Sequence, residues 1–151
     1  MAETIDEMAP FDFEATREYF GEVIHTYTRA QALEDGVLVD VSETAREAGI
    51  KYPVALTAEV FAKYVEVPEG VICQDVQGRL WDILWMFRTH AKGPLRPLSR
   101  WNEGPAEVIV YSLYVQNKPY PAKPKLVTLK AHCGPGDNLE PIITIMLPDQ
   151  D

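Results

Sequence analysis

The sequence predicts an α+β fold with a helical N-terminal half, a short strand near 37–41, a central helix near 75–91 and a C-terminal three-stranded antiparallel sheet. Apolar residues recur every three or four positions before residue 91, whereas β-branched and aromatic residues alternate or run together after residue 106. With 151 residues, of which 46% are hydrophobic, the chain can bury one core of its own. We expect a flexible acidic arm over 1–12 and a single domain over 13–151.

The first part of the chain contains signals for two helices and a strand. Apolar residues between Phe13 and Tyr27 lie three and four positions apart, which predicts a helix. Thr28 can cap a second, short helix that ends before Gly36. The apolar, largely β-branched sequence VLVDV then predicts a strand over 37–41.

Two more short helices are expected before the central one. Ser42 is a candidate N-cap for a helix over 43–48, and Thr57 is a candidate N-cap for a helix over 58–65. Pro53 lies between them and predicts an extended connection, because the residue before a proline avoids helical dihedral angles.

The strongest helix signal begins with Asp75 as N-cap and ends before Gly93. Trp81 and Trp85 widen its apolar stripe, so we expect this helix to contact several elements and to be the most buried in the molecule. Its inward face is expected to consist of five apolar residues that pack on the C-terminal sheet: Val76, Leu80, Ile83, Leu84 and Phe87.

The last third of the chain changes its period. Alternating or β-branched runs predict strands over 107–115, 124–133 and 140–148. A proline-spaced connection separates the first two strands, and a glycine-rich hairpin loop at 134–139 separates the last two. Consecutive strands joined in this way form an antiparallel sheet.

The formal net charge of −9 is concentrated at one end of the chain. Residues 1–43 contain eleven acidic residues and two basic ones, while residues 79–130 contain nine basic residues and three acidic ones. This polarity has three interpretations: an ordinary solvated surface, an acidic face that docks on a basic protein, or a basic patch that binds nucleic acid directly. The overall negative charge disfavours the third, because phosphates would be repelled at long range.

The composition excludes several classes of protein. No apolar run approaches the ~20 residues of a membrane span, and the acidic N-terminus does not have the pattern of a secretory signal. Two cysteines are too few for a disulfide scaffold, so we expect a soluble, cytoplasmic protein. No phosphate-binding loop and no metal-ligand spacing is present, so no cofactor is expected.

Three residues could contribute to a small-ligand or catalytic site. Asp82 lies between two tryptophans, His132 ends a predicted strand, and Asp137 lies in the glycine-rich loop at 134–138. Each also has a structural interpretation: pairing with an arginine for Asp82, a surface position for His132, and a hairpin turn for the loop. His132 and Cys133 point to opposite faces of a strand, which places the thiol in the core.

Other residues could contact a macromolecular partner. Aromatic side chains next to basic residues are typical of interface hot spots, and carboxylates in the first 43 residues could meet a basic surface. The candidate partner-binding residues are Glu14, Glu18, Glu22, Asp35, Trp101, Tyr111 and Tyr120. For the tyrosines, the alternative is packing in the core, because strands favour this residue type.

Three stretches of the chain, 27–57, 75–86 and 132–148, resemble a bacterial protein family of unknown function that is carried on plasmids, integrative elements and phages. The resemblance implies a small accessory protein of mobile DNA and transfers no catalytic or binding residue. We therefore predict a non-catalytic protein that binds a macromolecular partner. A small enzyme or ligand-binding domain is the alternative, and the oligomeric state stays open.

Overall fold

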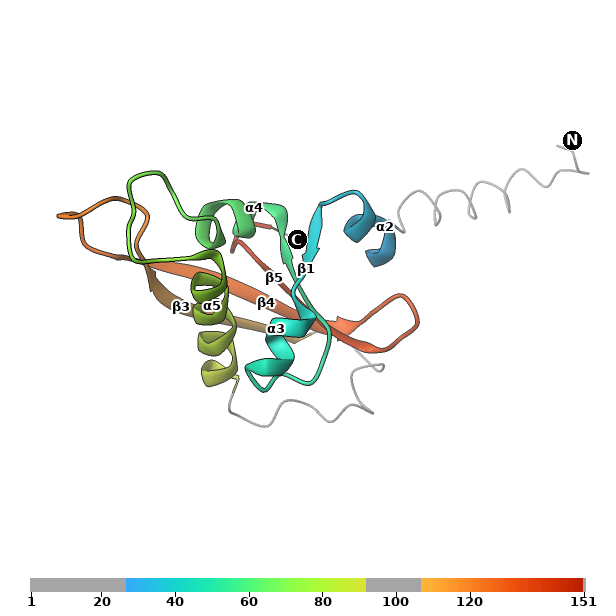
Figure 1. The fold of residues 1–151 in the computed structure, drawn as a ribbon. Helices are drawn as coiled ribbons and strands as arrows, with labels where there is room; N and C mark the ends of the chain where they lie inside the picture. The colour runs from blue at the N-terminus through green and yellow to red at the C-terminus, as the bar shows by residue number, and fades with distance from the viewer. Residues whose placement is uncertain (1–26, 92–106, 151) are drawn as a thin grey trace, which may run out of the picture.

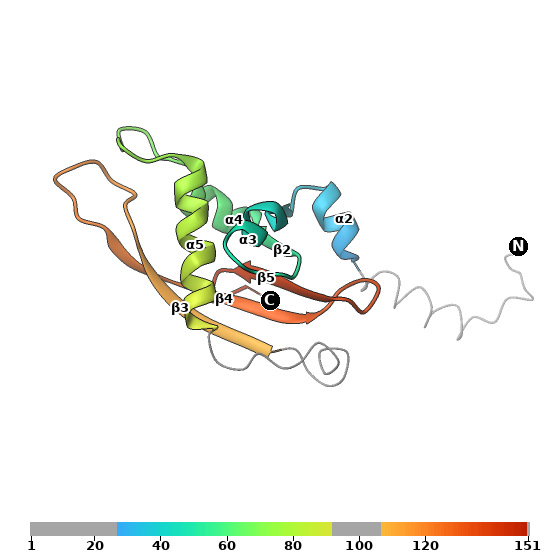
Figure 2. The same ribbon diagram turned by 60° about the horizontal axis from the view of Figure 1, so that its bottom comes forward.

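The computed structural model describes residues 27–91 and 107–150 of the chain. A five-stranded mixed sheet carries helices on one face, as Figures 1 and 2 show. In chain order the elements are α2 (Arg29–Glu34), β1 (Leu38–Asp40), α3 (Ser42–Glu47), β2 (Val54–Thr57), α4 (Ala58–Val60), the π-helical turn η1 (Phe61–Val65), α5 (Val76–His90), β3 (Glu107–Val115), β4 (Lys125–Pro135) and β5 (Pro141–Met146).

The sheet has the strand order β1-β2-β5-β4-β3, so the prediction of a three-stranded sheet behind a helical half is wrong. β3, β4 and β5 do form the expected antiparallel meander. β2 adds to it in parallel with β5, and β1 pairs antiparallel with β2. β2 was expected as a connection because Pro53 precedes it; yet all four of its residues are buried, and burial between β1 and β5 makes it a strand.

Local capping signals are confirmed at three helices. The Thr28 hydroxyl accepts a hydrogen bond from the Gln31 N–H at 3.1 Å and caps α2. Thr57 accepts one from the Val60 N–H at 3.3 Å before α4, and Asp75 accepts one from the Gly78 N–H at 2.6 Å before α5. These side chains offer the acceptors that the first turn of a helix requires.

Ser42 is not the N-cap that the sequence predicts. α3 starts at Ser42 itself, after Val41, whose side chain makes no capping hydrogen bond. The Ser42 hydroxyl instead donates to Asp40 Oδ1 at 2.6 Å and accepts from the Val54 N–H at 3.0 Å. The Ser42 side chain thus joins the start of α3 to the start of β2. The local sequence does not indicate that Val54 is its partner.

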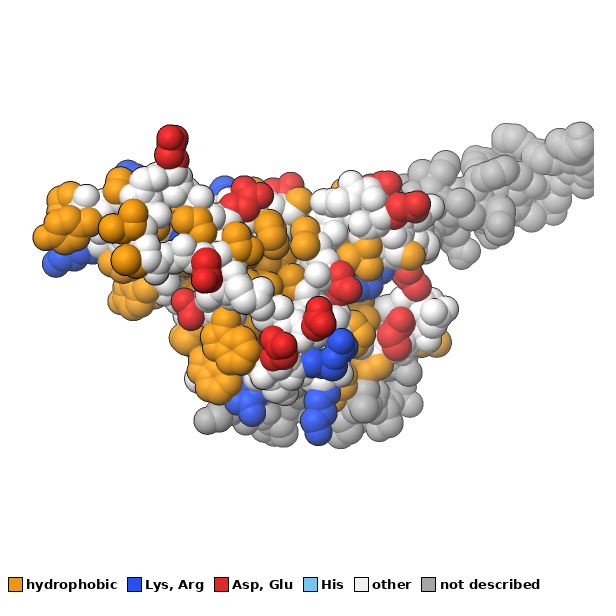
Figure 3. Space-filling model, viewed as in Figure 1, with side chains coloured by type: hydrophobic (Ala, Val, Ile, Leu, Met, Phe, Trp, Pro, Cys, Tyr) orange, Lys and Arg blue, Asp and Glu red, His pale blue; other side chains and the backbone are white. Residues whose placement is uncertain are grey.

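α5 lies across the sheet and contributes much of the core. Leu80, Ile83, Leu84 and Phe87 are buried as expected, whereas Val76 is 43% exposed and belongs to the first turn of the helix. The Trp81 and Trp85 rings stack with centroids 6.0 Å apart. Figure 3 shows hydrophobic side chains gathered over α5 and over the end of the β3–β4 hairpin. No helix among the described residues is long and apolar enough to cross a membrane.

The two faces of the β3–β4 hairpin differ in burial. Tyr111 and Leu113 of β3, with Leu129 and Cys133 of β4, point into the core under α5. The alternate residues point away from it. We call this second set the open face; it consists of Val108, Val110, Ser112 and Tyr114 of β3 and, opposite them in register, His132, Lys130, Thr128 and Leu126 of β4.

Candidate functional site

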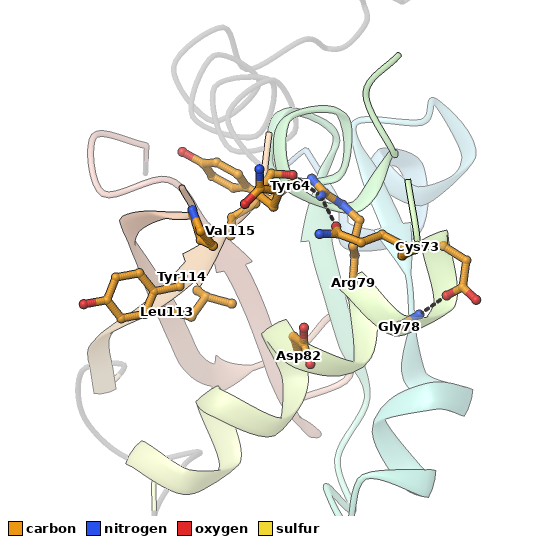
Figure 4. Close-up of a pocket in the computed structure, with 12 residues that line it drawn as sticks. Tyr64, Cys73, Gly78, Arg79, Asp82, Leu113, Tyr114 and Val115 are labelled. Atoms are coloured by element: carbon orange, nitrogen blue, oxygen red, sulfur yellow. Dashed lines mark hydrogen bonds between the residues drawn. The ribbon is translucent and has the colours of Figure 1, made fainter. Parts of the chain in front are cut away.

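A cavity of about 610 Å³ opens between α5 and the C-terminal half of β3. Gly78, Arg79 and Asp82 line it from the helix, and Leu113–Gln116 line it from the strand and its end, as Figure 4 shows. Tyr64, Pro124 and residues 73–75 complete the wall. Its volume lies in the range of about 300–1,000 Å³ that small-ligand sites occupy. We call this cavity the groove.

Arg79 holds the elements around the groove together. The residue is only 6% exposed, and its Nη1 donates to Gln74 Oε1 and to the Gln116 carbonyl, both at 2.8 Å. Its Nη2 donates to Asn117 Oδ1 at 2.5 Å, and the Asn117 amide donates in turn to the Lys63 carbonyl at 2.9 Å. Burial lowers the pKa of the guanidinium, which the charge of Asp82 partly opposes.

Asp82 is an acidic residue of the groove whose carboxylate is not held by hydrogen bonds of the described residues. Its carboxylate lies between α5 and β3 in Figure 4 and accepts no hydrogen bond from the part of the chain that the structure describes. Burial raises the pKa of this carboxyl, and the nearby charge of Arg79 opposes the rise. The carboxylate is therefore available to a cation or to a hydrogen-bond donor.

The three residues of the candidate ligand site do not meet. Asp82 lines the groove on the α5 side of the sheet, and His132 is exposed on the open face. The Asp137 carboxylate accepts hydrogen bonds from the backbone N–H groups of Arg29 at 2.9 Å and Ala30 at 3.0 Å. The hairpin loop thus caps α2, a helix that lies far from it in the sequence.

Cys133 is a core residue, as the strand alternation predicts. Its side chain is fully buried, and burial, assisted by the charge of Glu107, raises the pKa of the thiol to about 12. The thiol is neutral near pH 7 and packs as a small apolar group.

The candidate partner-binding residues fall into three groups. Tyr120 is 91% exposed, and Asp35 is exposed at the end of α2, where its carboxylate accepts a hydrogen bond from the Tyr27 hydroxyl. Tyr111 is buried and donates to the Ile83 carbonyl at 3.2 Å, so it packs in the core and a partner cannot reach it. Trp101 and the three glutamates at positions 14, 18 and 22 lie outside the described residues, as does the arm over 1–12.

The sequence offers Arg79 only as a partner for Asp82, and it predicts neither the hydrogen bonds by which Arg79 joins α5 to the end of β3 nor the apolar character of the open face. A signal for Arg79 exists: it stands beside Leu80 on α5 and one turn before Ile83, so its side chain must emerge next to the apolar stripe. No signal in the sequence points to Gln74, Gln116 and Asn117 as its acceptors, because two of these follow β3 and meet the helix only in the folded chain.

Replacing Asp137 by alanine is expected to cost about 1–2 kcal/mol of stability and to loosen α2, because two backbone N–H groups lose their acceptor. Hydrogen exchange of the α2 amides and a denaturant titration measure the two effects. Asn138→Ala, in the same loop, is the matched control, since its side chain makes no hydrogen bond within residues 27–91 and 107–150. Equal losses in the two variants would contradict the capping role.

A family model described as a family of unknown function, DUF6573, matches residues 12–151. The chain belongs to this family. The matched range of this DUF6573 chain contains the groove, the open face and the loop that caps α2. No curated protein and no solved structure matches the chain.

Proposed function

We propose that this protein is a non-catalytic accessory protein of a bacterial mobile genetic element that acts by binding another protein. The resemblance of three stretches of the chain supports the biological setting. The open face supports the mode of action, because four large apolar side chains are exposed on it: Val108 by 50%, Val110 by 61%, Tyr114 by 69% and Leu126 by 59%. Several large apolar side chains exposed on one face of a hairpin are typical of an interaction surface.

The exposure is confined to one part of the sheet. Towards β5 the same side of the sheet is reached by the Arg29 side chain of α2, which donates to Thr144 Oγ1 at 2.6 Å and to the Ile143 carbonyl at 3.1 Å. The Asp137 carboxylate in the hairpin loop accepts hydrogen bonds from the first turn of α2. The β3–β4 part of the open face has no such cover among the described residues, and this contrast favours it as the docking surface.

The partner that we propose is a basic protein of the kind that binds nucleic acid. Residues 1–43 contain eleven acidic residues, and such a charge raises the rate at which a basic protein associates with this chain. The alternative, an enzyme that uses Asp82, His132 and the 134–138 loop, requires these groups to share one site. Their placement on three parts of the fold favours binding over that alternative.

Charge reversal of Glu14, Glu18 and Glu22 to lysine is expected to slow association with the partner by about tenfold at low salt. The partner is first identified by affinity capture and mass spectrometry, and the purified pair is then measured by surface plasmon resonance. The free energy of unfolding should stay unchanged, because solvated charges contribute little to stability.

The matched control carries the same change in net charge outside the acidic segment, as Glu47→Lys, Glu66→Lys and Asp149→Lys, all exposed in the structure. This control should retain most of the association rate. Full association by the first variant would refute acidic docking. Binding of DNA by the wild type alone, with a steep salt dependence, would support the nucleic-acid interpretation instead.

A further inference from the structure

The two edges of the described sheet differ in how they are protected. β1 is three residues long, ends in the exposed carboxylate of Asp40, and is followed at once by α3. β3, at the other edge, is nine residues long, contains no proline, and has a single charged residue, Glu107, at its start. Proteins commonly guard edge strands by shortness, charge or proline, because an open edge can pair with another chain. Among the described residues, β3 has none of these guards beyond Glu107 at its start.

The groove follows the same edge. Leu113, Tyr114 and Val115 form its strand side, and α5 forms the opposite side through Arg79 and Asp82. An edge strand with a helix beside it is an arrangement that receives an extended peptide as an added strand. Backbone hydrogen bonds to the edge then provide affinity, and pockets between strand and helix select side chains.

We propose that an extended segment of the partner protein pairs with β3 as an added strand along the groove and places a lysine or arginine side chain against Asp82. This inference rests on the proposed function and specifies how the partner is held. The added strand would also extend the open face beyond Val108, Val110 and Tyr114, where the body of the partner can cover the exposed apolar side chains.

The charges of the groove favour a cation at this position. Asp75 and Asp82 line it, and Asp75 is already engaged by the Gly78 N–H. The Arg79 guanidinium is held by three neutral acceptors around the groove, so the Asp82 carboxylate has no hydrogen-bonded cation among the described residues. One incoming cation would balance the two carboxylates against one guanidinium, and a hydrogen bond between two charged groups is stronger than one between neutral groups.

Selection of a random 12-residue peptide library displayed on phage against the purified full chain tests this proposal. Enriched peptides are expected to contain a lysine or arginine flanked by alternating β-branched residues, as a strand requires. Synthetic copies should bind Asp82→Asn at least about tenfold more weakly than the wild type, a change of about 1.4 kcal/mol. Glu47→Gln, which removes an exposed carboxylate from α3, should bind them like the wild type.

Hydrogen exchange locates the bound peptide. Protection should increase at the β3 amides, and Val110→Lys, which guards the edge, should weaken binding more than Leu126→Lys one strand further in. The proposal is overturned if no peptide is enriched, if Asp82→Asn binds the peptides equally, or if protection appears only at β3–β3 contacts of a dimer. Capture of the protein partner by Asp82→Asn at wild-type strength would overturn this inference and leave the proposed function standing.

Discussion

Leu84→Ala is expected to lower the free energy of unfolding by about 2–5 kcal/mol, because a fully buried leucine is replaced by a cavity. Leu84 lies on α5 among the residues of the single core cluster, next to Ile83 and within one turn of Leu80 and Phe87. Denaturant titration with a fixed m-value measures the loss. Leu84 is fully buried, and the side chains of a packed core relax only partly into such a space.

The control for this variant is Val76→Ala in the first turn of the same helix. Val76 is 43% exposed, and its truncation should cost less than about 1 kcal/mol. A loss below that value for Leu84→Ala as well would mean that α5 does not carry the core. The comparison separates burial from helix propensity, because both variants end in alanine on the same helix.

Arg79→Met is expected to destabilise the protein by about 3 kcal/mol, because its guanidinium donates to three acceptors that remain part-buried when it is removed. The effect should be local as well as global. Arg79 connects α5 to Gln116 and Asn117 at the end of β3, so amides of the 116–124 connection should exchange faster in the variant.

Arg88→Met is the matched control on the same helix. The Arg88 guanidinium lies 5.2 Å from the centroid of the Trp85 ring, a half-buried contact for which about 0.5–1 kcal/mol is expected. If Arg79→Met is as stable as the wild type, dehydration of the buried charge offsets its hydrogen bonds, and the clamp contributes no net stability. In that case Arg79 would still hold the end of β3 against α5, and faster hydrogen exchange of the 116–124 amides in the variant would show it.

These two variants also bear on function. The groove depends on the distance between α5 and the edge strand, and Arg79 spans that distance. Loss of the clamp should therefore weaken peptide binding together with stability. Asp82→Asn changes the charge of the groove but removes none of the hydrogen bonds of Arg79, so comparing the two variants distinguishes the architecture of the groove from recognition of its ligand.

The sequence by itself determined the local features of this protein. The caps at Thr28, Thr57 and Asp75 could be predicted because a capping side chain meets N–H groups only two or three residues away. The strands of the β3–β5 meander and the inward direction of Cys133 could be predicted because side chains alternate along a strand.

Only the tertiary structure decided the features that join distant segments. β2 becomes a strand by pairing with β5, Asp137 caps a helix from the far end of the chain, and Arg79 finds its acceptors beyond β3. Local sequence patterns do not predict such pairings, because the propensity of a short segment does not depend on which distant segment it will contact. The candidate site belongs to this second class. Asp82 is visible in the sequence, but only the approach of the edge strand β3 to α5 places it in a groove.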